Sequence, residues 1–276
     1  MRYVLLDGPM GTELARRGAS LESPGWSAHA LESAPGVVAA IHRDYVAAGA
    51  TVHTANTFRT TPRAVGTRWT ALLRRAVDIA RSSVPAGHRV AGSIAPVEDC
   101  YRPDLSPGAG ARSAHRELAR ALAGEGVDLI LCETFPSGAE AAVAVEAAAR
   151  TGLPTWVALT AGPCASLMTP AEMARAARDC HEAGAAAVLV GCTAADRTLA
   201  FLLEIAPLGT TLGAYANAGD PAAGLGWGAA ALPSADEGAA RYARLAESWA
   251  GAGATILGGC CGTGPDHIAR LRAALQ

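Results

Sequence analysis

A pair of adjacent cysteines near the end of the chain has the residue types and the setting of a metal site. Cys260 and Cys261 stand in the run Gly258-Gly259-Cys260-Cys261-Gly262, directly after a short apolar stretch. Neighbouring cysteines can face one ion only if the backbone turns sharply, and the flanking glycines allow the positive φ angles that such a turn needs. Glycine-rich spacing contributes little to core packing, so we interpret this pair as metal ligands rather than as buried apolar filler.

A third thiolate would complete an open zinc site. Cys192 is the natural candidate because it follows Gly191 at the end of another apolar stretch. Three thiolates leave one position free on a tetrahedral ion, and a substrate sulfur could occupy it. The sequence therefore predicts a catalytic Zn²⁺ held by Cys192, Cys260 and Cys261. The remaining cysteines are interpreted as small buried residues: Cys100, Cys132, Cys164 and Cys180. The seven histidines show no paired spacing, so a histidine zinc site is not expected.

Short β-rich runs alternate along the whole chain with longer alanine- and arginine-rich segments of helical periodicity, which is the pattern of repeated βα units. Eight strands are expected, at Tyr3–Leu6, Ala50–Thr54, Arg89–Gly92, Asp128–Cys132, Thr155–Thr160, Ala187–Val190, Thr211–Ala214 and Ala254–Leu257. The helices between them are expected at Val37–Ala48, Thr70–Ser82, Ser113–Gly124, Ser137–Thr151, Pro170–Ala183, Asp196–Ala206, Ala235–Gly251 and Pro265–Ala274. Eight units predict a single α/β domain over residues 1–276, a (β/α)₈ TIM barrel. An open doubly wound sheet is the alternative, but no Gly-x-Gly-x-x-Gly fingerprint follows the first strand.

Active sites of such barrels form at the carboxyl ends of the strands. The residues that follow the expected strands are therefore the candidate site: Asp7, Gly8, Asn56, Thr57, Ser93, Glu133, Cys192, Tyr215, Asn217, Cys260 and Cys261. Carboxylates do not usually join three thiolates on zinc, so we expect Asp7 and Glu133 to hold a substrate ammonium group. The alternative for Asp7 is a turn cap. Asn56 and Asn217 could equally satisfy loop backbone.

Composition narrows the classes of function. The formal net charge of −2 and the absence of a basic cluster argue against nucleic acid or an anionic membrane as partner. All 23 basic residues are arginine, so mechanisms that need a lysine amine are excluded. Seven cysteines without a secretory signal favour a reducing, cytoplasmic location, and no apolar run is long enough to span a bilayer. The outer helices would suit a monomer or a homodimer.

Several motifs together resemble the zinc-dependent homocysteine S-methyltransferases, from one end of the chain to the other. They are Leu6-Asp7-Gly8-Pro9-Met10-Gly11-Thr12-Glu13-Leu14, Trp26-Ser27-Ala28, Thr54-Ala55-Asn56-Thr57-Phe58, Glu133-Thr134, Tyr215-Ala216-Asn217-Ala218-Gly219 and Gly258-Gly259-Cys260-Cys261-Gly262-Thr263. The resemblance implies a (β/α)₈ barrel whose zinc takes the homocysteine sulfur as its fourth ligand, with Asp7 and Glu133 against the ammonium group. Two positions depart from the family pattern: Gly191 stands where asparagine is frequent, and Ala55 where threonine is frequent.

The mechanism expected from this resemblance is methyl transfer to a thiolate. Attack on a sulfonium merges opposite charges, which a dry site favours. Trp26 is the candidate for cation–π contact with the donor, with Trp227 or Tyr215 as possible partners. S-methylmethionine is the first expected donor, S-adenosylmethionine the second and betaine the third, because a folate or cobalamin route normally needs further modules. Selenohomocysteine or another thiol could replace homocysteine as acceptor.

Two other classes of function stay open at the level of sequence. A metal-independent barrel hydrolase or lyase could use Asp7 and Glu133 as acid and base. A barrel that only binds zinc or a thiol amino acid, as a sensor or a store, would need the same cysteines without the methyl transfer.

Overall fold

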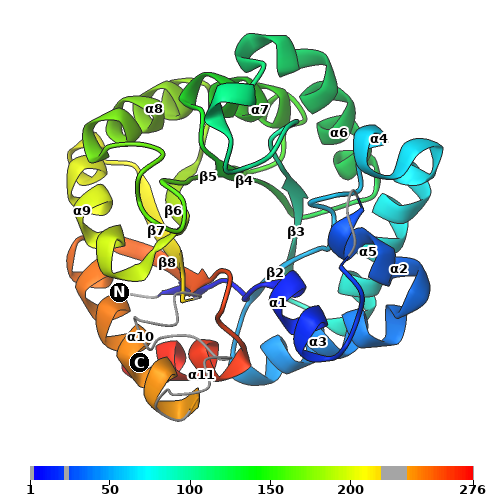
Figure 1. Cartoon of the computed structure of the whole chain (residues 1–276), viewed down its shortest axis with the longest axis horizontal. Helices are drawn as coiled ribbons and strands as arrows, with labels where there is room; N and C mark the ends of the chain where they lie inside the picture. The colour runs from blue at the N-terminus through cyan, green and yellow to red at the C-terminus, as the bar shows by residue number, and fades with distance from the viewer. Residues whose placement is uncertain (1–2, 22–24, 219–234, 276) are drawn as a thin grey trace.

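A barrel of parallel strands forms the centre of the protein. The computed structural model describes residues 3–21, 25–218 and 235–275. Eight strands make one sheet in the order β1-β8-β7-β6-β5-β4-β3-β2, and a bridge between Leu6 and Val52 joins its two edges. Two backbone hydrogen bonds also cross this seam, from Thr51 N to Leu5 O (2.8 Å) and from Asp7 N to Val52 O (3.0 Å). Helices surround the nearly closed barrel (Figure 1), which confirms the predicted (β/α)₈ fold.

The elements have the following bounds. The strands are β1 (Val4–Leu5), β2 (Val52–Thr54), β3 (Arg89–Ile94), β4 (Leu129–Phe135), β5 (Thr155–Leu159), β6 (Ala187–Ala194), β7 (Thr211–Asn217) and β8 (Ala254–Gly259). The α-helices are α1 (Met10–Arg16), α2 (Ala30–Ser33), α3 (Pro35–Ala48), α4 (Pro62–Val65), α5 (Trp69–Ser83), α6 (Arg112–Gly124), α7 (Gly138–Ala149), α8 (Pro170–Glu182), α9 (Ala195–Ile205), α10 (Ala235–Gly251) and α11 (Pro265–Leu275). Short 3₁₀ turns are η1 (Trp26–His29), η2 (Gly66–Arg68), η3 (Pro103–Leu105), η4 (Gly108–Ala111) and η5 (Ala206–Leu208).

Every expected strand and helix is present, which confirms the predicted succession of βα units. The predicted helix Pro170–Ala183, for example, is α8 at Pro170–Glu182. Its start is fixed by a capping box in which Thr169 and Glu172 bond each other's backbone N–H groups. Glycines at positions 49, 126, 152 and 184 follow helices, and all four have the positive φ that ends a helix.

The core has two layers, separated by the barrel wall. Inside the barrel, bulky side chains such as Leu131, Trp156 and Leu189 pack on one another. Outside, a larger cluster fills the space between the strands and the helices. Because side chains fill the barrel, a substrate can enter only at the carboxyl ends of the strands.

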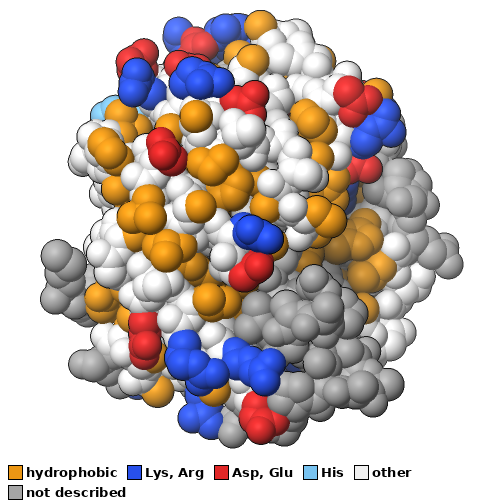
Figure 2. Space-filling view, turned by 60° about the vertical axis from the view of Figure 1, so that its left-hand side comes forward, with side chains coloured by type: hydrophobic (Ala, Val, Ile, Leu, Met, Phe, Trp, Pro, Cys, Tyr) orange, Lys and Arg blue, Asp and Glu red, His pale blue; other side chains and the backbone are white. Residues whose placement is uncertain are grey.

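The outer surface mixes side-chain types. Figure 2 shows one face, on which hydrophobic side chains spread over the middle while arginine and acidic side chains gather mostly towards the top and bottom. Leu203 on α9 is the most exposed large apolar side chain of the described residues, at 56%. Among the described helices, none has the length and apolar character of a membrane span.

Candidate active site

Irregularities at the ends of two strands place the central side chains of the site. On β6, Val188 and Val190 pack on the outer core and Leu189 packs inside the barrel. Strict alternation would send Cys192 outward with the valines. The pairing with β7 shifts register between Gly191 and Ala194, and Cys192 has a φ of 48°. This bulge turns the Cys192 side chain into the barrel.

A similar irregularity ends β4. Leu131 packs inside the barrel and Phe135 outside, although an even spacing of residues should send both to the same face. The register shifts between Cys132 and Phe135, and Thr134 has a φ of 62°. The shift leaves Glu133 at the mouth of the barrel and the Thr134 hydroxyl 3.3 Å from the sulfur of Cys192.

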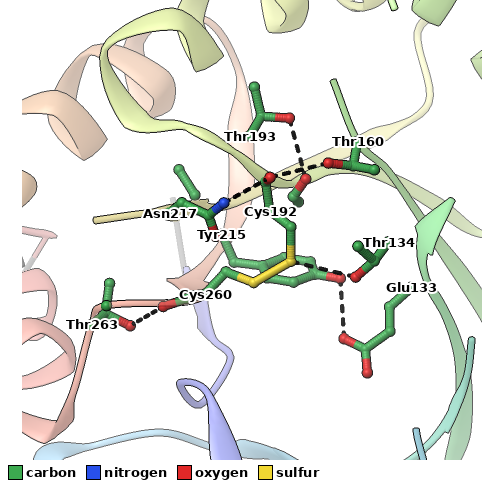
Figure 3. The surroundings of a disulfide bond; sticks show 12 residues. Glu133, Thr134, Thr160, Cys192, Thr193, Tyr215, Asn217, Cys260 and Thr263 are labelled. Atoms are coloured by element: carbon green, nitrogen blue, oxygen red, sulfur yellow. Dashed lines mark hydrogen bonds between the residues drawn. A yellow bond between two sulfur atoms is a disulfide. The ribbon is translucent and has the colours of Figure 1, made fainter. Parts of the chain in front are cut away.

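The cysteines predicted as metal ligands converge at this mouth. Cys192 and Cys260 are joined by a disulfide, with their Cα atoms 5.5 Å apart, and Cys261 is a free thiol on the same cavity wall. The backbone around the sulfurs is firmly held (Figure 3). The carbonyl of Cys192 accepts from Thr160 (3.0 Å) and from Asn217 (2.9 Å), and the carbonyl of Cys260 accepts from Thr263 (2.8 Å).

Glu133 is bound by two hydroxyl groups beside the sulfurs. Ser93 donates to one carboxylate oxygen, and Tyr215 donates to the other at 3.4 Å. Burial raises the pKa of Glu133 to about 6, although both hydroxyl groups act in the opposite direction. The carboxylate is therefore present at neutral pH, with no ion pair to any described residue.

Asp7 is the second buried carboxylate of the site, 4% exposed. It accepts from the backbone N–H of Thr54 (2.8 Å) and from the Thr54 hydroxyl (3.1 Å). Burial raises its pKa well above the ordinary range, and the neighbouring charge of Glu133 adds to the effect. Neither carboxyl group forms an ion pair with a described residue, so a cationic group could bind to both in this cavity.

Other predicted site residues use their polar atoms to hold neighbouring loops. Asn56 accepts from the Ser27 hydroxyl (2.7 Å) and donates to the Ser27 carbonyl (2.8 Å). The Thr57 hydroxyl accepts from Ser93 N (2.8 Å) and donates to Ser93 O (3.0 Å). Asn217 bonds Cys192 through its nitrogen, while its Oδ1 has no hydrogen-bond partner among the described residues. These contacts position the cavity wall.

Aromatic side chains form a further part of the wall. The Trp26 ring lies edge-on to Phe58, with 6.1 Å between ring centroids, and packs against Gly11, where an added Cβ would come within 2.3 Å of it. Gly8 similarly leaves room for Tyr45, whose hydroxyl would lie 2.6 Å from a Cβ at that position. Trp227, a possible partner of Trp26 in the sequence analysis, is outside the described residues.

Most of the predicted site residues line one cavity of about 660 Å³: Asp7, Gly8, Trp26, Asn56, Glu133, Cys192, Tyr215, Cys260 and Cys261. Thr57, Ser93 and Asn217 are not part of its lining. This volume suits a pair of small-molecule substrates. The wall also contains residues that the sequence analysis did not select: Phe58, Arg59, Arg63, Glu98, Asp99, Cys100 and Tyr101. Phe58 directly follows a selected residue and could have been added, whereas the others lie in long connections without a motif.

The β3–α6 loop contains Glu98, Asp99, Cys100 and Tyr101 of the cavity wall, and hydrogen bonds to Glu140 hold this loop in place. This carboxylate is fully buried at the start of α7. It accepts from Val97 N (2.8 Å), from the Ser106 hydroxyl (2.5 Å) and from His115 Nε2 (3.1 Å). Burial works to raise the pKa of Glu140, but these hydrogen bonds outweigh it and hold the pKa below its ordinary range. Glu140 thus joins both ends of the loop segment that lines the cavity.

A second group of metal-ligand side chains adjoins the site. Asp7, His42 and His53 each offer a ligand atom within 4.8 Å of the others, and all three are buried. Burial lowers the pKa of His42 to about 3 and that of His53 to about 4, so both rings are neutral at neutral pH. No paired histidine spacing in the sequence indicates this group, because α3 and β2 bring together two histidines that lie far from any such spacing.

The cysteine donor set fits a zinc ion on chemical grounds. Cys192, Cys260 and Cys261 line the cavity from β6 and from the turn after β8, and thiolates are preferred ligands of zinc. The disulfide between Cys192 and Cys260 must be reduced before both sulfurs can bind an ion.

The chain is similar to known proteins along nearly its whole length. The family model described as homocysteine S-methyltransferase matches residues 4–275. Homocysteine S-methyltransferase of Escherichia coli is 31% identical, over 98% of this chain and 94% of its own. Crystal structures of homocysteine methyltransferase MmuM from Escherichia coli are similar in both a metallated and an oxidised form, each with a TM-score of 0.80 and 27% identity. They cover 99% and 98% of this chain, and 96% and 95% of their own chains.

The match spans nearly the whole barrel and includes the motifs that surround the cavity. The chain therefore belongs to the homocysteine S-methyltransferase family and is a methyltransferase.

Proposed function

We propose that this protein is a single-barrel enzyme that transfers a methyl group from a sulfonium donor to the thiol of L-homocysteine, using Zn²⁺ held by Cys192, Cys260 and Cys261. S-methylmethionine is the first proposed donor and S-adenosylmethionine the second. One observation carries the proposal: Cys192, Cys260 and Cys261 line the same cavity as the buried Asp7 and the partly buried Glu133, neither of which forms an ion pair with a described residue. Such a cavity complements an amino acid that has both a thiol and an ammonium group.

The carboxyl groups would orient the acceptor. The ammonium group of homocysteine would donate to Glu133 and Asp7, whose hydrogen bonds to Tyr215, Ser93 and Thr54 fix their directions. The amino acid side chain would then reach the cysteine sulfurs. Zinc, when bound, lowers the pKa of a coordinated thiol, so that the acceptor sulfur is a thiolate at neutral pH.

The chemical step is a direct displacement. The acceptor sulfur attacks the methyl carbon, a new carbon–sulfur bond forms, and the bond from the methyl group to the donor sulfonium breaks. The donor leaves as a neutral thioether, and the thiol proton has already passed to solvent. Because two opposite charges disappear, a site that excludes water favours the transition state over the separated ions.

The cavity wall offers contacts for a cationic donor. Trp26 presents an aromatic surface and Asp99 an acidic side chain on this cavity. Glu98 forms an ion pair with Arg63 (2.6 Å), and the Phe58 ring is in contact with Arg59, so these two side chains are already engaged. A cation over an aromatic ring gains about 0.5 to 2 kcal/mol. These features favour a sulfonium or another onium compound over a neutral donor, and betaine therefore remains the second candidate class.

A donor comparison tests the proposal. Reduced, zinc-loaded enzyme is given homocysteine with S-methylmethionine, S-adenosylmethionine or betaine in separate assays, and methionine is quantified. The expected result is methionine formation with a sulfonium donor at a rate at least tenfold above that with betaine. Methionine formation from betaine alone would contradict the sulfonium assignment, and no product from any donor would contradict the methyl transfer.

A further inference from the structure

The histidine group behind Asp7 contains ring nitrogens that the described residues leave without partners. Both nitrogens of His42 and the Nδ1 of His53 are buried and make no hydrogen bond. A buried polar atom without a partner costs about 1–3 kcal/mol. An ion bound between the two rings and the neighbouring carboxylate would satisfy one nitrogen of each ring.

We propose that Asp7, His42 and His53 bind a divalent transition-metal ion, with Zn²⁺ as the first candidate, at a site separate from the three cysteines. The observation that carries this proposal is the convergence of one carboxylate and two neutral imidazoles, all buried and all within 4.8 Å of one another. Imidazole and carboxylate together are a common ligand set for zinc and related ions.

The hydrogen bonding of His53 supports this assignment. Its Nε2 lies 3.0 Å from Nδ1 of His88, which is partly exposed. If the Nε2–H donates to His88, the lone pair of a neutral His53 is on Nδ1, which is the atom without a partner. Metal-binding histidines commonly donate their second ring N–H to such an outer group, which fixes the tautomer. His88 would have this role.

The ligand atoms are near enough for one ion. Zinc bonds nitrogen and oxygen at about 2.0–2.2 Å, so the ligand atoms of a tetrahedral site lie about 3.3–3.6 Å apart. The three ligand atoms are within 4.8 Å of one another, and an inward movement of the side chains would complete the site. Asp7 can bind the ion and still accept from the ammonium group of the proposed substrate. A carboxylate has about four acceptor positions, and Thr54 uses two of them.

The position of the site indicates what the ion would do. Asp7 follows β1, His53 lies on β2 and His42 lies on α3. Strands β1 and β2 are joined only by the bridge between Leu6 and Val52 and by a few hydrogen bonds, so this seam is the least paired part of the barrel. An ion bound there would link the two strands and the helix that covers them.

Metal binding by a variant without the active-site cysteines tests the proposal. The triple variant Cys192→Ser/Cys260→Ser/Cys261→Ser lacks the proposed cysteine site. Any zinc that it binds is therefore independent of whether the cysteine site exists. The variant is stripped with a chelator and dialysed against Zn²⁺, and bound metal is measured by mass spectrometry. We expect about one equivalent of zinc per chain, which is lost when His53→Gln is added. Adding His181→Gln, which changes an exposed histidine, should leave the equivalent in place.

Cobalt provides a second measurement that does not depend on a further variant. Co²⁺ bound to the variant without Cys192, Cys260 and Cys261 should show visible absorption bands without the ultraviolet thiolate charge-transfer band. A rise in Tm with added Zn²⁺ is expected as well. A folded triple-serine variant that holds no zinc, or whose zinc remains after His53→Gln, would overturn the proposal. If His53→Gln does not fold, a Co²⁺ spectrum with thiolate charge transfer would overturn it instead.

Discussion

The ring of Tyr215 occupies the space that a side chain at position 191 would need. A Cβ added to Gly191 would lie 2.7 Å from Cζ and 3.0 Å from the hydroxyl oxygen of Tyr215. The same hydroxyl donates to Glu133. The absence of a side chain at position 191 therefore makes room for the ring that helps to orient the proposed ammonium-binding carboxylate.

Gly191→Ala is expected to displace Tyr215. The overpacking should reduce the free energy of unfolding by about 1–3 kcal/mol and should raise KM for homocysteine through the lost bond to Glu133. Urea unfolding and steady-state kinetics measure both effects. Gly36→Ala is the control, because no atom would lie within 4 Å of its Cβ. Equal behaviour of the two variants would contradict the packing argument.

The pH dependence of the reaction should report the ionisation of Glu133. Burial raises the pKa of this carboxyl to about 6, so the anion that binds an ammonium group is lost as the pH falls through this value. We expect kcat/KM for homocysteine to decrease below about pH 6. In Glu133→Gln the value should be low throughout and this decrease should be absent. An unchanged acidic limb in the variant would assign the ionisation to another group.

Trp26 should contribute to donor binding and not to acceptor binding. Trp26→Leu is expected to raise KM for the sulfonium donor about 2- to 30-fold, the equivalent of 0.5–2 kcal/mol, with little change for homocysteine. Trp26→Phe should restore part of the loss because it keeps an aromatic face. Equal losses for both substrates would show instead that the ring only supports the wall.

Asn56 should act through the same loop. Its amide group holds Ser27, the neighbour of Trp26, by two hydrogen bonds. Asn56→Ala is therefore expected to raise KM for the donor as Trp26→Leu does. The double variant should raise KM for the donor by less than the two single effects combined, because both substitutions disrupt the same loop contact. Full additivity in the double-mutant cycle would separate Asn56 from Trp26.

Glu140 should stabilise the β3–α6 loop in a pH-dependent way. Its pKa is lower in the folded protein than in the unfolded chain, so its stabilisation is present above the unfolded pKa and is lost as the pH falls through the folded pKa. Glu140→Gln should lower Tm at neutral pH, and the difference from wild type should shrink in acid. Glu117→Gln, on the exposed face of α6, should have no such effect. A pH-independent difference would contradict the role of the charge.

The sequence was sufficient for the order of the elements and for much of the site. Hydrophobic periodicity located all eight units, and the residues after the strands included Asp7 and Glu133 and the cysteines Cys192, Cys260 and Cys261. Strand alternation alone would have turned Cys192 outward, and only the bulge on β6 corrects this. Such bulges depend on tertiary packing and leave no periodic signal.

Contacts between distant segments were beyond the sequence. His42 and His53 meet because α3 packs on β2, and Tyr101 reaches the cavity because Glu140 holds its loop. Neither relationship follows from the spacing of the residues, since each depends on how separate elements pack.

Zinc content and methionine formation, measured together in wild type, Cys260→Ala and Cys164→Ala, test the central claim most directly. Cys164, which was interpreted from the sequence as a buried residue, is exposed and lies outside the cavity, so it provides the matched control. We predict that Cys260→Ala loses one equivalent of zinc relative to the reduced wild type and loses methionine formation, whereas Cys164→Ala retains both. A Cys260→Ala variant that binds as much zinc and forms methionine as fast as the wild type would contradict the three-cysteine site.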